Sequence, residues 1–112
     1  MSQRRYPVLS VEEVEAILLA RHFVLDHTKG DHRYYSLNVR GKECIAQVDT
    51  GCSNYSHSLI KLLLNETMLS REEFYCSTKT TAKKINKKCV CKDELNNWYT
   101  LKPQSRKKLF AN

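Results

Sequence analysis

The sequence predicts a two-layer α+β domain, in which a three-stranded antiparallel sheet carries helices on one face. Two consecutive stretches, 33–40 and 43–49, alternate between apolar and polar residues, as half-buried antiparallel strands do. Apolar residues at helical spacing precede and follow these strands, at 11–21 and 56–64. Because an amphipathic helix has to bury its apolar stripe, both helices are expected to cover the same face of the sheet.

The first helix is predicted from about Val11 to Arg21. Ser10 and Glu13 form a capping box at its start, in which each side chain accepts a hydrogen bond from the other residue's backbone N–H. The apolar residues at helical spacing are Val11, Val14, Ile17 and Leu18.

Three strands are expected to follow. Aromatic and β-branched residues predict the first at 23–28, alternation predicts the second at 33–40, and the third follows at 43–49 after a tight turn at Arg40-Gly41-Lys42. The residues expected to face inward are Tyr35, Leu37, Val39, Cys44, Ala46 and Val48. By the same parity, His32 is expected on the outer polar face with Tyr34 and Ser36.

A loop at 50–54 is predicted to lead into the second helix, from about Ser56 to Leu64. Ser70 and Glu73 then repeat the capping-box pattern and predict a short helix that runs through Tyr75. Past Cys76 the pattern fades. A helix at 78–85 is one reading of the segment that follows, and either disorder or loose docking on the body is expected for the rest.

Charge divides the chain into two parts. Residues 1–76 carry nine Lys and Arg against ten Asp and Glu, whereas residues 77–112 carry ten against two. We therefore predict a nearly neutral folded domain at 1–76 and a basic extension at 77–112 that attracts a polyanion. A solvated basic tail without a partner is the alternative.

The remaining composition narrows the class of protein. No apolar run reaches the length of a membrane span, and Glu12, Glu13 and Glu15 interrupt any signal-type segment. A soluble, cytoplasmic protein without a membrane partner is expected. Five cysteines without a paired pattern predict free thiols in a reducing compartment.

His32 is the predicted catalytic residue. It stands where the turn of Lys29-Gly30-Asp31 passes into a strand, which holds an imidazole rigidly in contact with solvent, and histidine transfers protons near neutral pH. Lys29 and Arg33 flank it and are predicted to bind phosphate, Gly30 lets the backbone approach closely, and Tyr34 is predicted to bind phosphate or stack on a base. For each, an ordinary structural or solvated residue is the alternative.

Other candidate chemistries are weaker. His27 is a possible second acid–base group. A zinc site would have to use Cys76, Cys89 and Cys91, whose spacing does not match paired zinc knuckles, and a Cys52 nucleophile with His57 has no supporting motif. No cofactor or metal is predicted.

The order of these elements resembles the HicA family of toxin ribonucleases from HicA–HicB toxin–antitoxin pairs. The matching stretch runs from about Val11 to Cys76. It includes Lys29-Gly30-Asp31-His32, the strand Ile45-Ala46-Gln47-Val48, the helix segment 58–63, and the closing segment Leu69-Ser70-Arg71-Glu72-Glu73-Phe74. Where the family usually has a serine, this chain has Asp31, whose carboxylate either orients the neighbouring imidazole or repels phosphate.

The resemblance implies a fold like that of double-stranded-RNA-binding domains and metal-independent cleavage of mRNA by a single histidine, which maps onto His32. It also implies a HicB-like antitoxin that covers this site. We expect the basic extension, with Lys83, Lys84, Lys87 and Lys88, to bind RNA without sequence preference. A non-catalytic RNA-binding module of the same fold is the alternative function, and a protein that binds an acidic partner through its tail is a third.

Overall fold

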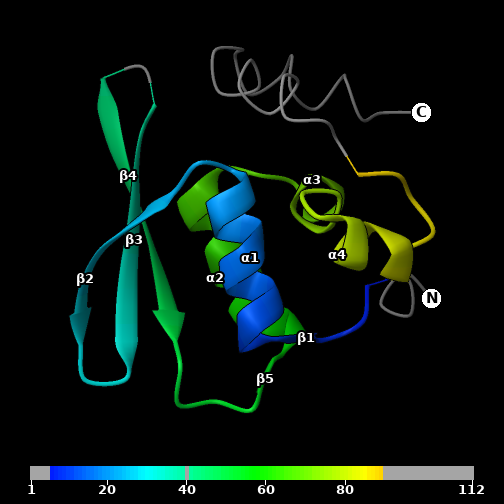
Figure 1. Cartoon of the computed structure of the whole chain (residues 1–112), viewed down its shortest axis with the longest axis horizontal. Coiled ribbons are helices and arrows are strands. Elements are labelled where there is room, and N and C mark those ends of the chain that lie inside the picture. The colour runs from blue at the N-terminus through cyan, green and yellow to red at the C-terminus, as the bar shows by residue number, and fades with distance from the viewer. Residues whose placement is uncertain (1–5, 40, 90–112) are drawn as a thin grey trace.

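The computed structural model describes residues 6–39 and 41–89. One layer is a three-stranded antiparallel sheet with the strand order β2-β3-β4, and α1 and α2 cover one of its faces (Figure 1). The predicted α+β class and the order helix, three strands, helix are confirmed. The elements are β1 (Leu9–Ser10), α1 (Val11–Ala20), β2 (Val24–Lys29), β3 (His32–Val39), β4 (Lys42–Asp49), β5 (Asn54–Tyr55), α2 (His57–Thr67), α3 (Arg71–Tyr75) and α4 (Lys79–Lys84).

The predicted capping box starts α1. The Glu13 N–H donates to Ser10 Oγ at 3.1 Å, and the Ser10 N–H donates to Glu13 Oε1 at 2.9 Å. The apolar stripe is buried against the sheet as predicted, and it consists of Val11, Val14, Ile17 and Leu18. The helix ends at Ala20, and His22 turns the chain toward β2 with a positive φ of 72°.

The inner face of the sheet forms the core with the helices. Tyr35, Cys44, Ala46 and Val48 are buried there, as the alternation predicted. Glycines with positive φ occupy both turns, Gly30 between β2 and β3 and Gly41 between β3 and β4. The pairing of β2 with β3 shifts between Leu25 and His27, a bulge at Asp26 that the sequence pattern did not predict.

A second, two-stranded sheet joins the N-terminal segment to the loop before α2. Leu9 pairs with Tyr55, and Ser10 pairs with Asn54. The predicted loop therefore ends one residue earlier than expected, because Asn54 already belongs to a strand. Ser56 caps α2, which extends three residues past the predicted end at Leu64 and stops at Met68, where φ is 63°.

The first part of the basic extension packs against the body. The buried Arg21 side chain donates from Nε to Ser77 Oγ at 2.8 Å and from Nη2 to the Glu73 carbonyl at 2.7 Å. Lys84 Nζ lies 2.7 Å from Glu13 Oε2. Thr81 and Ala82 of α4 are buried as well. Residues 77–89 thus dock on α1 and α3, and independent folding of 1–76 stays a prediction.

Candidate functional site

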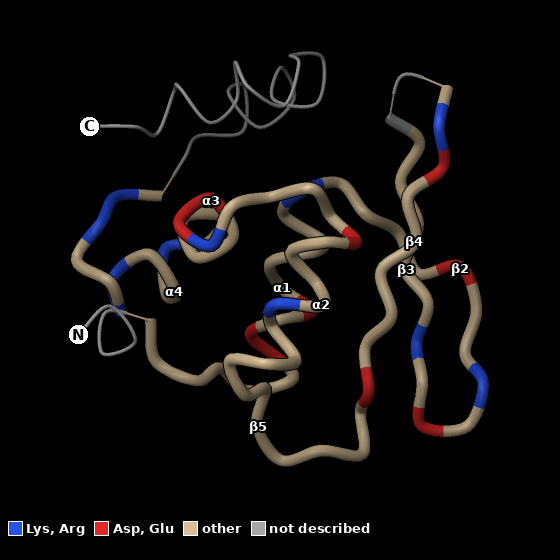
Figure 2. Tube along the Cα trace, turned by 180° about the vertical axis from the view of Figure 1, so that it is seen from behind, with Lys and Arg blue, Asp and Glu red and all other residues tan. Residues whose placement is uncertain are grey.

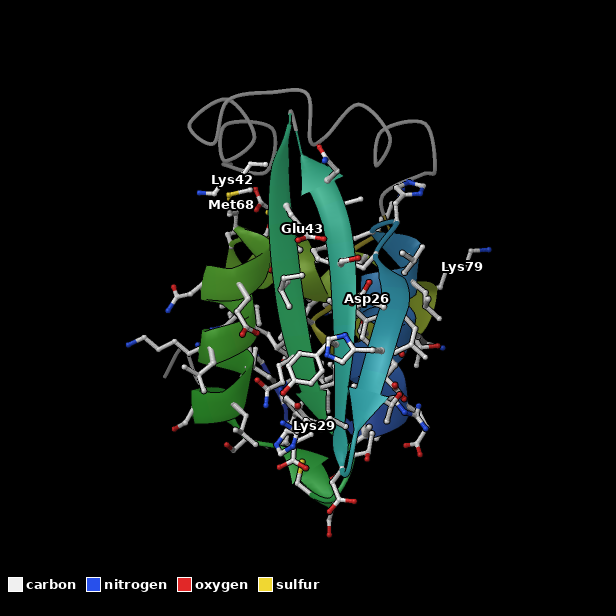
Figure 3. All side chains as sticks on the ribbon, turned by 90° about the vertical axis from the view of Figure 1, so that its left-hand side faces the viewer. Asp26, Lys29, Lys42, Glu43, Met68 and Lys79 are labelled. Carbon is white, nitrogen blue, oxygen red and sulfur yellow. The ribbon has the colours of Figure 1, made fainter. Side chains whose placement is uncertain are left out.

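His32 is the first residue of β3 and follows the two-residue turn Gly30–Asp31. The turn reverses the chain with Gly30 at a φ of 59°, a conformation that favours glycine. His32 pairs with Lys29 on β2 and with Asp49 on β4. Residues paired across an antiparallel sheet point to the same face, so these three side chains form one row at the end of the outer face. Lys29 is labelled there in Figure 3.

The turn that carries His32 is tied to the loop after β4. Thr50 donates to the Asp31 carbonyl oxygen twice, from its backbone N at 2.7 Å and from Oγ1 at 3.0 Å. The carboxylates of Asp31 and Asp49 both approach Gly51, where a Cβ would lie 3.2 Å from an oxygen of each. The Gly51 N–H donates to Asp49 Oδ1 at 2.8 Å. These contacts fix the position of His32 relative to β4.

His32 also lines a hollow of about 190 Å³ at the edge of the sheet, where β4 meets α2. Leucines of α2 form its apolar wall, and β4 together with the end of α2 provides polar groups. The residues that line the hollow are His32, Gln47, Asp49, Tyr55, Leu59, Leu62, Leu63 and Glu66.

The polar side of this hollow is acidic. Glu66 Oε1 accepts a hydrogen bond from the Gln47 N–H at 3.2 Å. Burial raises the pKa of Glu66, and this hydrogen bond offsets only part of the increase. The Asp49 N–H donates to Tyr55 Oη at 2.6 Å, and burial raises the pKa of that phenol. His32 therefore lies between the cation of Lys29 on β2 and the carboxylates of Asp49 on β4 and Glu66 on α2.

His27 and Tyr34 form a stacked pair in the next row of the outer face. Their ring centroids are 4.4 Å apart and their planes differ by 10°. His27 Nδ1 lies 2.7 Å from Asp26 Oδ2, and both side chains are about half exposed. The structure thus brings together four polar side chains, from Lys29, His32 and Tyr34 of the predicted site and from His27.

The position of His27 beside Tyr34 could have been predicted from the sequence. A two-residue turn at 30–31 pairs residue 29 with 32 and residue 27 with 34, so the turn alone places His27 beside Tyr34. The bulge at Asp26, which puts a carboxylate next to the His27 ring, could not have been predicted from the sequence pattern.

Arg33 is not part of this group, and the prediction that it flanks His32 at one phosphate needs correction. Successive strand residues point to opposite faces, and Arg33 points inward to α1. Its Nη1 lies 2.8 Å from Glu15 Oε2, which also accepts from Tyr35 Oη at 2.6 Å. This hydrogen bond to Glu15 raises the pKa of Arg33, and burial together with Glu15 raises that of Tyr35 to about 12.

The predicted lysines of the extension lie on the other side of the molecule. Basic residues gather on α4 and the segment after it, on the side of α1 away from the sheet (Figures 1 and 2). Lys83, Lys84 and Lys87 line a second hollow of about 520 Å³, and Lys88 is exposed beside them. Because Lys84 is paired with Glu13, its charge is partly neutralised. None of these four lysines is near His32.

Cys52 and Cys76 are free thiols in the described part of the chain. Burial raises the pKa of Cys52 and raises that of Cys76 to about 11, which favours the protonated form over the thiolate that a nucleophile or metal ligand needs. His57, the suggested partner of Cys52, is hydrogen-bonded through Nε2 to the Tyr6 carbonyl oxygen.

Residues 6–39 and 41–89 contain no group of three His, Cys, Asp or Glu side chains arranged to hold a metal ion, and Cys91 lies outside them. Within the same ranges, no helix has the length and apolar character needed to cross a bilayer. No family model matches the chain, and no curated protein and no solved structure matches it either.

Proposed function

We propose that this chain is a cytoplasmic, metal-independent endoribonuclease of the HicA type, an mRNA interferase in which His32 transfers a proton. The observation that carries the proposal is the row formed by Lys29 and His32 at the end of the outer face. A rigidly held imidazole next to a cation is suited to cleaving a phosphodiester, because the reaction needs both proton transfer and neutralisation of negative charge.

The reaction uses the 2′-hydroxyl of the RNA as the nucleophile. As O2′ attacks the adjacent phosphorus, a base removes the 2′-OH proton and an acid protonates the departing O5′. His32 performs one of these transfers, which typically contributes about two to four orders of magnitude to the rate. Lys29 stabilises the charge on the non-bridging phosphate oxygens.

The outer face also suits a protein partner, in accord with an antitoxin of the HicB type. Large apolar side chains are exposed around the site, with Val24 at 60%, Ile45 at 38% and Leu62 at 60%. Val24 and Ile45 both pair with Ser36 in the register of the sheet, so they lie on the same face as His32. Exposed apolar area that is rimmed by polar groups is typical of interaction surfaces.

A non-catalytic RNA-binding module is the second candidate. Asp49 and Glu66, on the wall of the hollow beside His32, disfavour a phosphate there. The lysines around α4 are far from these carboxylates and provide a cationic surface for the RNA backbone. In this case RNA would bind at α4 and the His32 row would play no chemical part.

The deciding experiment is cleavage of a long single-stranded RNA in excess EDTA by the parent chain and by His32→Ala. His22→Asn is the matched control, because it removes a histidine outside the site while asparagine tolerates the positive φ of that position. We expect cleavage by the parent and the control, and at least about a hundredfold slower cleavage by His32→Ala. Equal cleavage by all three would refute the assignment of His32. Binding without cleavage by any of them would favour the module.

A further inference from the structure

We propose that His27 is the second proton-transfer residue of the site, held in place by Asp26 and Tyr34. The inference rests on the proposed ribonuclease function and extends it, because a phosphodiester cleavage without metal needs an acid and a base at the same phosphate. The described geometry points to His27 as the group that complements His32.

The register places the two histidines on the same face of adjacent strands. His27 pairs with Tyr34 and Lys29 pairs with His32, so His27 and His32 are diagonal neighbours. Diagonal neighbours on one face of an antiparallel pair are about 7–8 Å apart. We expect a phosphate bound over this face to lie between the two side chains, within hydrogen-bonding reach of both rings. Lys29, which follows His27 by two residues, points to the same face.

The surroundings of His27 fix its orientation. Its Nδ1 is hydrogen-bonded to Asp26 Oδ2 at 2.7 Å, so Nε2 is the ring atom left to exchange a proton with a substrate. The Tyr34 ring stacks on the imidazole at 4.4 Å and limits its rotation. The arrangement depends on the bulge at Asp26, which places this carboxylate next to the ring. Bulges are over-represented at sheet edges as well as beside active sites, and β2 is an edge strand, so the role of His27 is inferred from the contact of Asp26 with the ring and not from the bulge itself.

The chemistry balances with these two residues. One imidazole accepts the 2′-OH proton as the O2′–P bond forms, and the other, as an imidazolium, gives its proton to O5′ as the P–O5′ bond breaks. The products are a 2′,3′-cyclic phosphate and a 5′-hydroxyl. A water molecule then restores the two protonation states between turnovers.

The test compares two RNA substrates that differ only in the bridging atom of one linkage, which is either the natural 5′-oxygen or sulfur. A thiolate leaves without protonation, so the sulfur linkage does not need a general acid. We expect His27→Ala to slow cleavage of the oxygen linkage by about a hundredfold or more. If His27 is the acid, the same variant cleaves the sulfur linkage at nearly the parent rate; if it is the base, both linkages are slowed. Either result supports the proposal.

Two further variants examine the positioning residues. Tyr34→Ala removes the ring that stacks on His27 and is expected to lower kcat, and Tyr34→Phe, which restores a stacking ring, is expected to recover most of that loss. Asp26→Asn replaces the carboxylate that accepts from His27 Nδ1 and is expected to lower kcat without changing KM. The control is His22→Asn, which lies in the turn after α1.

The outcomes separate this inference from the proposed function. Cleavage of both linkages by His27→Ala at the parent rate, with His32→Ala inactive, would overturn the role of His27 and leave the ribonuclease proposal intact. Failure of the parent to cleave either substrate would overturn the proposed function, and this inference with it. Because His27 is exposed, its substitution is expected to leave the thermal unfolding temperature unchanged.

Discussion

Tyr34 and Tyr35 are neighbours in the chain and in β3, yet the two faces of the sheet give them opposite surroundings. Tyr35 is 4% exposed in the core, and its hydroxyl donates to Glu15 of α1. Tyr34 stacks on His27 on the open face. Arg33 and His32 are divided in the same way, with Arg33 bonded to Glu15 and His32 beside the hollow.

This division shows that strand parity, and not distance along the sequence, decides which polar residues remain available to a substrate. On the inner face the polar groups of β3 are used to bind α1. On the outer face they contact solvent and one another. Substitutions of inner-face residues should therefore lower the stability of the protein. Substitutions of outer-face residues should instead weaken RNA binding or slow RNA cleavage.

The largest expected difference is between the two tyrosines. Tyr35→Ala removes a buried aromatic ring and its hydrogen bond, and we expect it to lower the free energy of unfolding by about 3–5 kcal/mol. Tyr34→Ala, on the open face, is expected to lower it by about 1 kcal/mol or less. Urea denaturation of both variants measures the difference. Similar losses in the two variants would mean that the outer face is also part of the stabilising structure.

Arg33 and Lys29 provide a crossed comparison of charge. Arg33→Gln breaks a partly exposed ion pair and is expected to leave stability nearly unchanged, with RNA affinity unchanged. Lys29→Gln should leave stability nearly unchanged and weaken RNA binding, with a salt slope reduced by about 0.7 if one phosphate contact to a single strand is lost. Stability is measured by urea denaturation and affinity by titration at several salt concentrations. A weaker salt dependence of RNA affinity in Arg33→Gln would support the prediction that Arg33 binds phosphate.

The smallest expected effect concerns the titration of Tyr35. Its pKa is about 12 because burial and Glu15 both disfavour the phenolate. A raised folded-state pKa contributes stability that is fully present below the ordinary value near 10 and is lost as the pH rises through the folded value. Glu15→Gln is expected to lower the Tyr35 pKa and to narrow this alkaline window. Ultraviolet absorbance during a pH titration measures it, and an unchanged titration would contradict the contact.

Local signals predicted much of the fold. Both capping boxes involve residues three apart, and the inward residues of β3 and β4 follow from a period of two, so neither needs knowledge of distant segments. The same parity predicted the outer position of His32. Arg33 was predicted to lie beside His32 because residues that are neighbours in sequence were treated as neighbours in space. Strand parity places it on the opposite face.

The elements that escaped prediction depend on distant contacts. The pairing of β1 with β5 has only two residues on each side, which is too short for a periodic pattern. The bulge at Asp26 is a local shift in register that composition does not specify. Docking of residues 77–89 depends on the buried Arg21, whose partners are separated from it by 52 and 56 positions.

The contacts of Arg21 also affect the order in which the chain folds during synthesis. The side chain stands at the end of α1, but the groups that accept its hydrogen bonds are the Glu73 carbonyl and the Ser77 hydroxyl. A nascent chain that has not reached residue 77 cannot bury this guanidinium with its partners, and burial of an uncompensated charge is strongly unfavourable. We therefore expect the end of α1 to stay hydrated until the start of the basic segment has been made, so that α1 completes its packing after the sheet has formed.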